Sequence, residues 1–174
     1  MVPDSIQLVS LKEINCHEDI PETHPTIAGN AIQKAAYIKE HYGLDCFAED
    51  TGLEVEALDN APGVLTARYA GPQKDADDNM DLLLLNLEQQ SNRNARFKTV
   101  IALIWQGETY TFEGIAPGQI AKTRQGSEGF GYDPIFIPQN YERSFAQMTL
   151  EEKQKISHRG IATRQLIQFF QERI

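Results

Sequence analysis

The chain has few cysteines, no long apolar run and little positive charge. Two cysteines, Cys16 and Cys46, occur among 174 residues and form no Cys-x-x-Cys pair, so we expect neither a disulfide framework nor a zinc site. No segment approaches the roughly 20 apolar residues of a membrane-spanning helix. The first residues also lack the basic and apolar regions of a secretory signal. We therefore expect a cytoplasmic protein that does not bind membranes.

Positive charge is scarce, with 16 Lys and Arg against 25 Asp and Glu and a net charge of -9. A surface that follows the phosphates of a nucleic acid should be basic, so we expect no nucleic-acid partner. A small anionic substrate is compatible with this charge, because a metal ion and a few nearby cations can hold it. The length and the 41% hydrophobic content fit one domain over residues 1–174.

Apolar periodicity and capping residues predict a mixed α/β fold. Helices are predicted after Thr26, Asp75, Thr149 and Ser157, whose side chains can cap the helical repeats that follow, and the first helix should end at Gly43. A turn at residues 106–107 predicts an antiparallel hairpin between two strands. Helices together with such a hairpin favour a mixed α/β domain over a strict repeat of parallel βαβ units. The predicted strands are residues 5–9, 46–48, 53–57, 97–105, 110–112 and 115–121.

Residues 49–52 (EDTG) are the first candidate site. Two carboxylates at the end of a buried strand would be rigidly placed, and Mg²⁺ prefers hard oxygen ligands. The alternative is a solvated turn, since acidic turns are common.

The glycine-rich residues 126–134 (GSEGFGYDP) are the second candidate. The glycines allow a ligand to approach the backbone, two aromatic rings can cover a base, and Asp133 can accept hydrogen bonds from the base edge. The alternative is an ordinary connection that contributes two aromatic rings to the core.

Lys153 and residues 157–160 (SHRG) are the third candidate. Two cations and a histidine gather at a predicted helix N-terminus, where free N–H groups favour anions and the helix dipole disfavours cations. A bound phosphate or a base carbonyl would account for them. The alternative is a set of separate, solvated side chains.

Five segments together indicate a family. They are residues 30–35 (NAIQKA), 49–55 (EDTGLEV), 61–69 (APGVLTARY), 129–136 (GFGYDPIF) and 151–160 (EEKQKISHRG). In this order they resemble the motifs of the inosine/xanthosine triphosphate pyrophosphatase family, through nearly the whole chain. The resemblance implies a two-lobed α/β fold around a long mixed sheet, a nucleotide cleft between the lobes, and a homodimer.

The resemblance also implies hydrolysis of non-standard purine nucleoside triphosphates to the monophosphate and pyrophosphate, with Mg²⁺ as cofactor. Asp50 matches the proton acceptor and metal ligand, and Glu49 is expected to share the metal. Selection would come from donors that meet the 6-oxo group of hypoxanthine or xanthine, because an adenine amino group there would place donor against donor. The remaining matches are substrate contacts: Thr51, Phe130, Gly131, Tyr132, Asp133, Lys153, His158 and Arg159.

Two departures from the family pattern accompany the resemblance. Family members begin with a strand and a phosphate-gripping loop, and residues 5–9 here correspond to their second strand, so we expect weak triphosphate binding. A glutamate usually precedes the Asn-Ala pair, where this chain has Ala28 and Gly29. The competing hypothesis is therefore a nucleotide-binding or dimer-forming protein with little catalysis.

Overall fold

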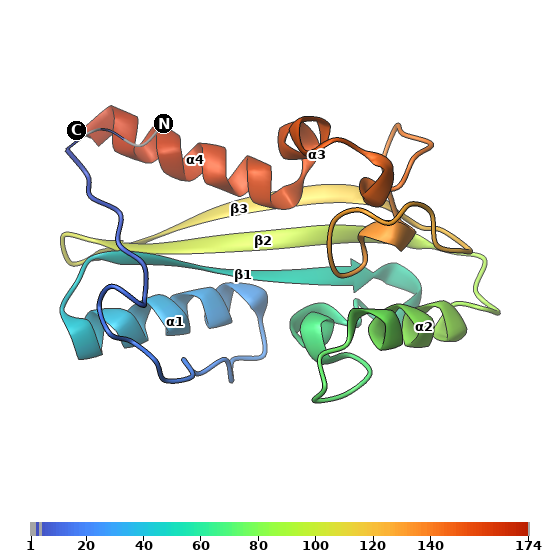
Figure 1. Ribbon diagram of the computed structural model, residues 1–174, viewed down its shortest axis with the longest axis horizontal. Helices are drawn as coiled ribbons and strands as arrows, with labels where there is room; N and C mark the ends of the chain where they lie inside the picture. The colour runs from blue at the N-terminus through green and yellow to red at the C-terminus, as the bar shows by residue number, and fades with distance from the viewer. Residues whose placement is uncertain (1–2, 4, 174) are drawn as a thin grey trace.

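The sheet of this protein is four-stranded, antiparallel and flanked by helices (Figure 1). The computed structural model describes residue 3 and residues 5–173. The strands follow one another in the order β1-β2-β3-β4, and each pairs antiparallel with the next. Their bounds are Cys46–Val55 for β1, Asn94–Trp105 for β2, Glu108–Ile120 for β3 and Phe136–Pro138 for β4. The mixed α/β class with flanking helices is confirmed.

The predicted helix caps are also confirmed. The Thr26 side chain accepts a hydrogen bond from the Gly29 N–H, Asp75 accepts one from Asp78, and the first helix ends at Gly43 in the left-handed conformation. These caps satisfy N–H and C=O groups that a helix end leaves without an intrahelical partner. The helices are α1 Ile27–Tyr42, α2 Ala76–Asn86, α3 Leu150–Ile156 and α4 His158–Arg173.

The two faces of the sheet are covered by different helices. Side chains alternate along β2, so Val100 and Ala102 pack against α1, whereas Ile101 and Leu103 pack against α4. Figure 1 shows α1 along one face and α4 along the other. A residue of β1 or β2 can therefore be assigned to the α1 face or the α4 face from its register.

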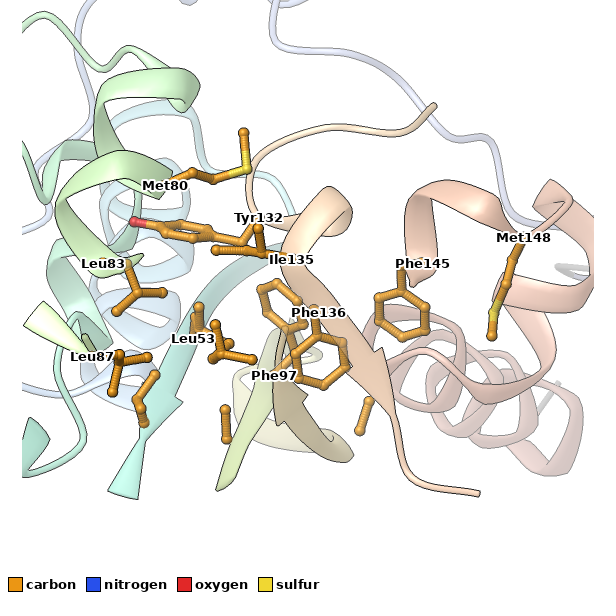
Figure 2. Packing of buried hydrophobic residues seen from close by; sticks show 14 residues of the cluster. Leu53, Met80, Leu83, Leu87, Phe97, Tyr132, Ile135, Phe136, Phe145 and Met148 are labelled. Atoms are coloured by element: carbon orange, nitrogen blue, oxygen red, sulfur yellow. The ribbon is translucent and has the colours of Figure 1, made fainter. Parts of the chain in front are cut away.

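The largest hydrophobic cluster joins the C-terminal end of β1 to the loops that follow β3. Leu53, Phe97 and Phe136 come from strands β1, β2 and β4 of the sheet, Leu83 comes from α2, and Phe145 comes from a short 3₁₀ helix after β4. Figure 2 shows these side chains as one continuous layer. The cluster fixes the glycine-rich loop, because Tyr132 and Ile135 at its end are part of it.

Several predicted strand bounds are wrong. Residues 5–9 form no strand in the described part of the chain, and Leu8 is 56% exposed, so this segment lacks the ladder and burial that would stabilise a strand. Residues 49–52 are not a turn. They lie within β1, where every residue from Cys46 to Val55 has a partner on β2. Ala57 belongs to a short 3₁₀ helix, and residues 108–120 form one strand where two were predicted.

None of the helices in the described residues combines the length and the apolar character required to span a bilayer.

Candidate functional site

β1 places the three polar residues of the first candidate on alternate faces. Glu49 lies opposite Ile101 and Thr51 lies opposite Thr99, which assigns both to the α4 face. Asp50 lies opposite Val100, on the α1 face. The structure therefore separates Glu49 from Asp50, since neighbouring residues of a strand point in opposite directions.

Asp50 faces two polar side chains of α1. The Lys34 ammonium donates to its Oδ1 at 3.1 Å, and the Asn30 amide donates to its Oδ2 at 3.4 Å. The same ammonium donates to Glu22 Oε1 at 2.6 Å. Burial raises the pKa of Asp50, and Lys34 offsets only part of that rise. A carboxylate with a raised pKa accepts a proton more readily than an exposed one.

Glu49 forms a two-point ion pair with Arg159. The guanidinium Nε lies 3.0 Å from Glu49 Oε2, and its Nη2 lies 2.6 Å from Oε1. This fork geometry fixes the plane of a guanidinium better than a single contact does. The contact orients Arg159 at the first turn of α4 and leaves Glu49 on the face away from Asp50.

A cavity of about 320 Å³ lies on the α4 side of β1. Thr51 lines it, and the hydroxyl oxygens of Thr51 and Thr99 are 2.6 Å apart, so one donates to the other. The cavity brings most of the predicted substrate-binding residues together: Thr51, Phe130, Gly131, Tyr132, Asp133, His158 and Arg159. Lys153 lines an adjoining cavity of about 410 Å³, which shares Phe130, His158 and Arg159 with the first.

Phe130 is an exposed aromatic ring with two cations close to it. Its side chain is 61% exposed. The Lys153 ammonium lies 4.8 Å and the Arg159 guanidinium carbon 5.3 Å from the ring centre, within the range of cation–π attraction. An aromatic ring that is held in place but uncovered offers a stacking surface for a planar ligand.

Asp133 is buried at the base of this cavity and is paired with a charge. It accepts hydrogen bonds from the Phe130 N–H at 2.9 Å and from the Lys153 ammonium. A Cβ at Gly129, which has a φ of 84°, would overlap the Asp133 carboxylate. Glycine is therefore needed for the loop to close over Asp133.

Tyr132 supports the site from within the core. Its ring is buried in the largest cluster, and its hydroxyl donates to the Thr66 carbonyl oxygen at 2.8 Å. Burial raises the pKa of this phenol. Tyr132 thus ties the glycine-rich loop to the segment after β1 and presents no free ring face comparable to that of Phe130.

His158 is a buried and neutral imidazole. It is 5% exposed and stacks on Phe97 with ring centres 4.6 Å apart. Burial, with smaller effects from Arg159 and Lys153, lowers its pKa to about 3. Its Nδ1 is the one buried side-chain nitrogen or oxygen without a hydrogen-bond partner among the described residues. Such a group is costly unless a ligand or water satisfies it.

Some residues at the site were given no role from the sequence. Asn30 and Lys34 belong to the NAIQKA motif, so their types were visible, but their contact with Asp50 depends on how α1 packs on β1. Lys74 lines the cavity and has a φ of 54°, a conformation that non-glycine residues seldom adopt. Nothing in the sequence around Lys74 indicates this.

The residues around Asp50 fit a divalent metal ion of the magnesium type. No group of three or more His, Cys, Asp or Glu side chains that could hold a metal occurs in the described residues. Mg²⁺ at phosphate sites is usually held by one or two carboxylates together with substrate phosphates and water. The Lys34 ammonium contacts both Glu22 and Asp50, so these two carboxylates face one positive charge.

Sequence comparison with known proteins identifies one family and relatives that share one name. A family model described as the Ham1 family matches residues 1–169. The chain is 59% identical over 170 residues to a dITP/XTP pyrophosphatase of Flavobacterium psychrophilum, covering 98% of this chain and 90% of that protein. A dITP/XTP pyrophosphatase of Thermoanaerobacter pseudethanolicus is 42% identical over 171 residues, covering 97% and 86%.

Solved structures agree with these relatives. The Staphylococcus aureus Ham1 protein superposes with a TM-score of 0.92 at 36% identity, over 97% of this chain and 88% of that one. A HAM1 protein from Coxiella burnetii gives a TM-score of 0.88 at 38% identity, over 92% and 84%. On this whole-length similarity, the chain belongs to the Ham1 family.

Proposed function

We propose that this protein hydrolyses non-standard purine nucleoside triphosphates, namely those of inosine, deoxyinosine and xanthosine, to the monophosphate and pyrophosphate. The observation that carries the proposal is the arrangement around residues 49–51 of β1. A cavity with a stacking ring and base-edge groups lies on the α4 face, and a carboxylate with a raised pKa lies on the α1 face. Relatives named dITP/XTP pyrophosphatase support the same substrates.

In this proposal the purine stacks on Phe130, and two charged groups read its edge. Arg159 can only donate hydrogen bonds, which suits the 6-oxo group and opposes the 6-amino group of adenine. Asp133 can only accept, which suits the N1–H of hypoxanthine or xanthine and opposes the bare N1 of adenine. His158 is neutral, so it adds a hydrogen-bonding group to the pocket and no further charge.

The phosphate chain then passes the edge of β1 toward Asp50. β1 is an outer strand of the sheet formed by the described residues, so its two faces are joined by a short path around the edge. Asp50 orients the attacking water and accepts its proton, and Lys34 and Asn30 hold the carboxylate in position. A bound Mg²⁺ would neutralise the phosphates and polarise the linkage between the α- and β-phosphates.

The test is an assay of the triphosphates of inosine, xanthosine and adenosine with Mg²⁺, in which monophosphate, pyrophosphate and inorganic phosphate are measured separately. We expect pyrophosphate from inosine and xanthosine triphosphate and little turnover of adenosine triphosphate. Release of inorganic phosphate alone, or equal turnover of all three, would contradict the proposal. Nucleotide binding without turnover would favour the non-catalytic alternative. The homodimer that the resemblance implies stays a prediction, which light scattering of the purified chain tests.

A further inference from the structure

Two threonine hydroxyls meet between β1 and β2, beside the proposed base pocket. Thr51 of β1 lies opposite Thr99 of β2, and their hydroxyl oxygens are 2.6 Å apart. Thr51 lines the cavity on the α4 face, whereas Thr99 is fully buried, with 0% of its surface exposed. The pair therefore joins a side chain that can touch a ligand to one that cannot.

The first turn of α4 covers the sheet next to Thr99. Gly114 of β3 lies opposite Thr99, and a Cβ added there would overlap the His158 carbonyl oxygen. Because Gly114 has no side chain, α4 can lie directly on the sheet at this point. The His158 ring stacks on Phe97, which precedes Thr99 by two residues and so shares its face of β2. Thr99 must therefore find its hydrogen-bond partners within the protein.

Burial decides which of the two hydroxyls donates. Within residues 3 and 5–173, the Thr99 hydroxyl has a single hydrogen-bond partner, the Thr51 oxygen. If Thr51 donated the shared hydrogen, the hydrogen of Thr99 would be buried without an acceptor, which is costly. If Thr99 donates, its hydrogen is satisfied and the hydrogen of Thr51 remains free to point into the cavity. The second arrangement is the more stable one.

We propose that Thr99 is a positioning residue, which holds the Thr51 hydroxyl as a hydrogen-bond donor to the nucleotide. Donation by Thr99 occupies a lone pair of the Thr51 oxygen and anchors that side chain. This inference rests on the proposed function for the identity of the ligand. Thr51 lines the base cavity and follows Asp50 in the chain, so it meets the part of the nucleotide between the base and the scissile linkage. The atom that faces it is an acceptor oxygen of the sugar or of the first phosphate.

The two directions of the hydrogen bond predict opposite effects for one substitution. Thr99→Val keeps the branched shape and removes the buried hydroxyl. If Thr99 donates, Thr51 loses its anchor and the nucleotide should bind more weakly. If Thr51 donates, the same substitution would release its hydrogen and tighten binding. Thr99→Ser keeps the hydroxyl and should bind the nucleotide as the unaltered chain does.

The experiment measures the dissociation constants of inosine monophosphate and of the α,β-methylene analogue of inosine triphosphate by calorimetry of the full chain with Mg²⁺. Thr99→Val should raise both constants roughly three- to tenfold, the value of one hydrogen bond between neutral groups. Thr51→Val should raise them at least as much. The double variant should match Thr51→Val, because Thr99 acts only through Thr51. The matched control is Thr111→Val, at an exposed threonine of β3 opposite Ala102, which should leave binding unchanged.

Unchanged or tighter binding in Thr99→Val, an equal loss in Thr99→Ser, or additive losses in the double variant would each overturn the inference. Additive losses are what a merely structural role of Thr99 would give, and a urea titration verifies that each variant is folded. Inosine serves as a further probe. A loss for inosine monophosphate alone assigns the acceptor to the first phosphate, and equal losses for both probes assign it to the sugar.

Turnover of inosine triphosphate is measured separately on the same variants. If the expected binding pattern appears without turnover by the unaltered chain, the proposed function fails and the role of Thr99 stands. If the unaltered chain turns over inosine triphosphate and the binding pattern is absent, the role of Thr99 fails and the proposed function stands.

Discussion

Asp50 is held between a buried environment that favours its protonated form and a lysine that favours its charged form. Replacing it with asparagine keeps the shape and removes both the base and the metal ligand. We expect Asp50→Asn to lower kcat for inosine triphosphate by at least ~10²-fold. Steady-state kinetics measures this, and a urea titration verifies that the variant is folded. A folded variant with near-normal turnover would remove Asp50 from the chemistry.

Arg159 and Glu49 form one unit, in which the carboxylate fixes the plane of the guanidinium. We expect Arg159→Ala to reduce the preference for inosine over adenosine triphosphate by roughly ten- to a hundredfold, the value of one hydrogen bond to a charged group. Glu49→Gln should act in the same direction and more weakly, because Arg159 remains but is less well oriented. The measurement is the ratio of kcat/KM for the two nucleotides.

A suitable control for this pair is Lys155→Ala, which removes an exposed α3 cation that pairs with Glu151. Its kcat/KM ratio should match that of the unaltered chain. Equal losses for both nucleotides in Arg159→Ala would mean that Arg159 holds phosphate and does not read the base.

At the scale of elements, the loop before α2 brings Lys74 to the cavity in a left-handed conformation. No ion pair of Lys74 occurs in the described part of the chain, whereas Lys34, Lys153 and Arg159 are each paired with a carboxylate. A cation without a carboxylate partner at the proposed substrate cavity is available to bind a phosphate. We expect Lys74→Ala to raise KM several-fold for inosine and adenosine triphosphate alike. A change in the ratio between them would instead place Lys74 at the base.

The helices could be predicted from the sequence and the course of β1 could not. A helix cap is local, because Thr26 and Asp75 bond to N–H groups three residues away. β1 runs through the polar residues 49–52 because β2 offers a partner to each of them, and that pairing joins residues 46 or more positions apart. The same long-range pairing determines that the Glu49 and Asp50 side chains point to opposite faces of the sheet. The residue types of the site were therefore predictable, and the division of Glu49 from Asp50 was not.

For the whole molecule, His158 links stability to pH. It is stacked on the core ring of Phe97 and its pKa is lowered to about 3, while an unfolded histidine titrates near 6.5. Between these values the unfolded chain binds a proton that the folded chain does not, so stability falls as pH falls. We expect His158→Gln to reduce this dependence by up to ~1.4 kcal/mol per pH unit across that window. Urea unfolding of both proteins at several pH values between 7.5 and 4.5 measures the difference, and identical slopes would contradict it.

The proposed base pocket and the proposed catalytic carboxylate Asp50 lie on opposite faces of the outer strand β1. This placement has a consequence for how the activity can change. Odd-numbered residues of β1 near the site, Glu49 and Thr51, reach only the α4 face, and the even-numbered Asp50 reaches only the α1 face. A substitution of an odd-numbered residue changes contacts on the α4 face and leaves the packing of the α1 face undisturbed. The reverse holds for an even-numbered residue. In the proposed function, recognition of the base depends on the α4 face and cleavage of the phosphate on the α1 face. The two would then be separately adjustable, and a lineage could acquire a new nucleotide preference by a single exchange without having to rebuild its hydrolytic machinery.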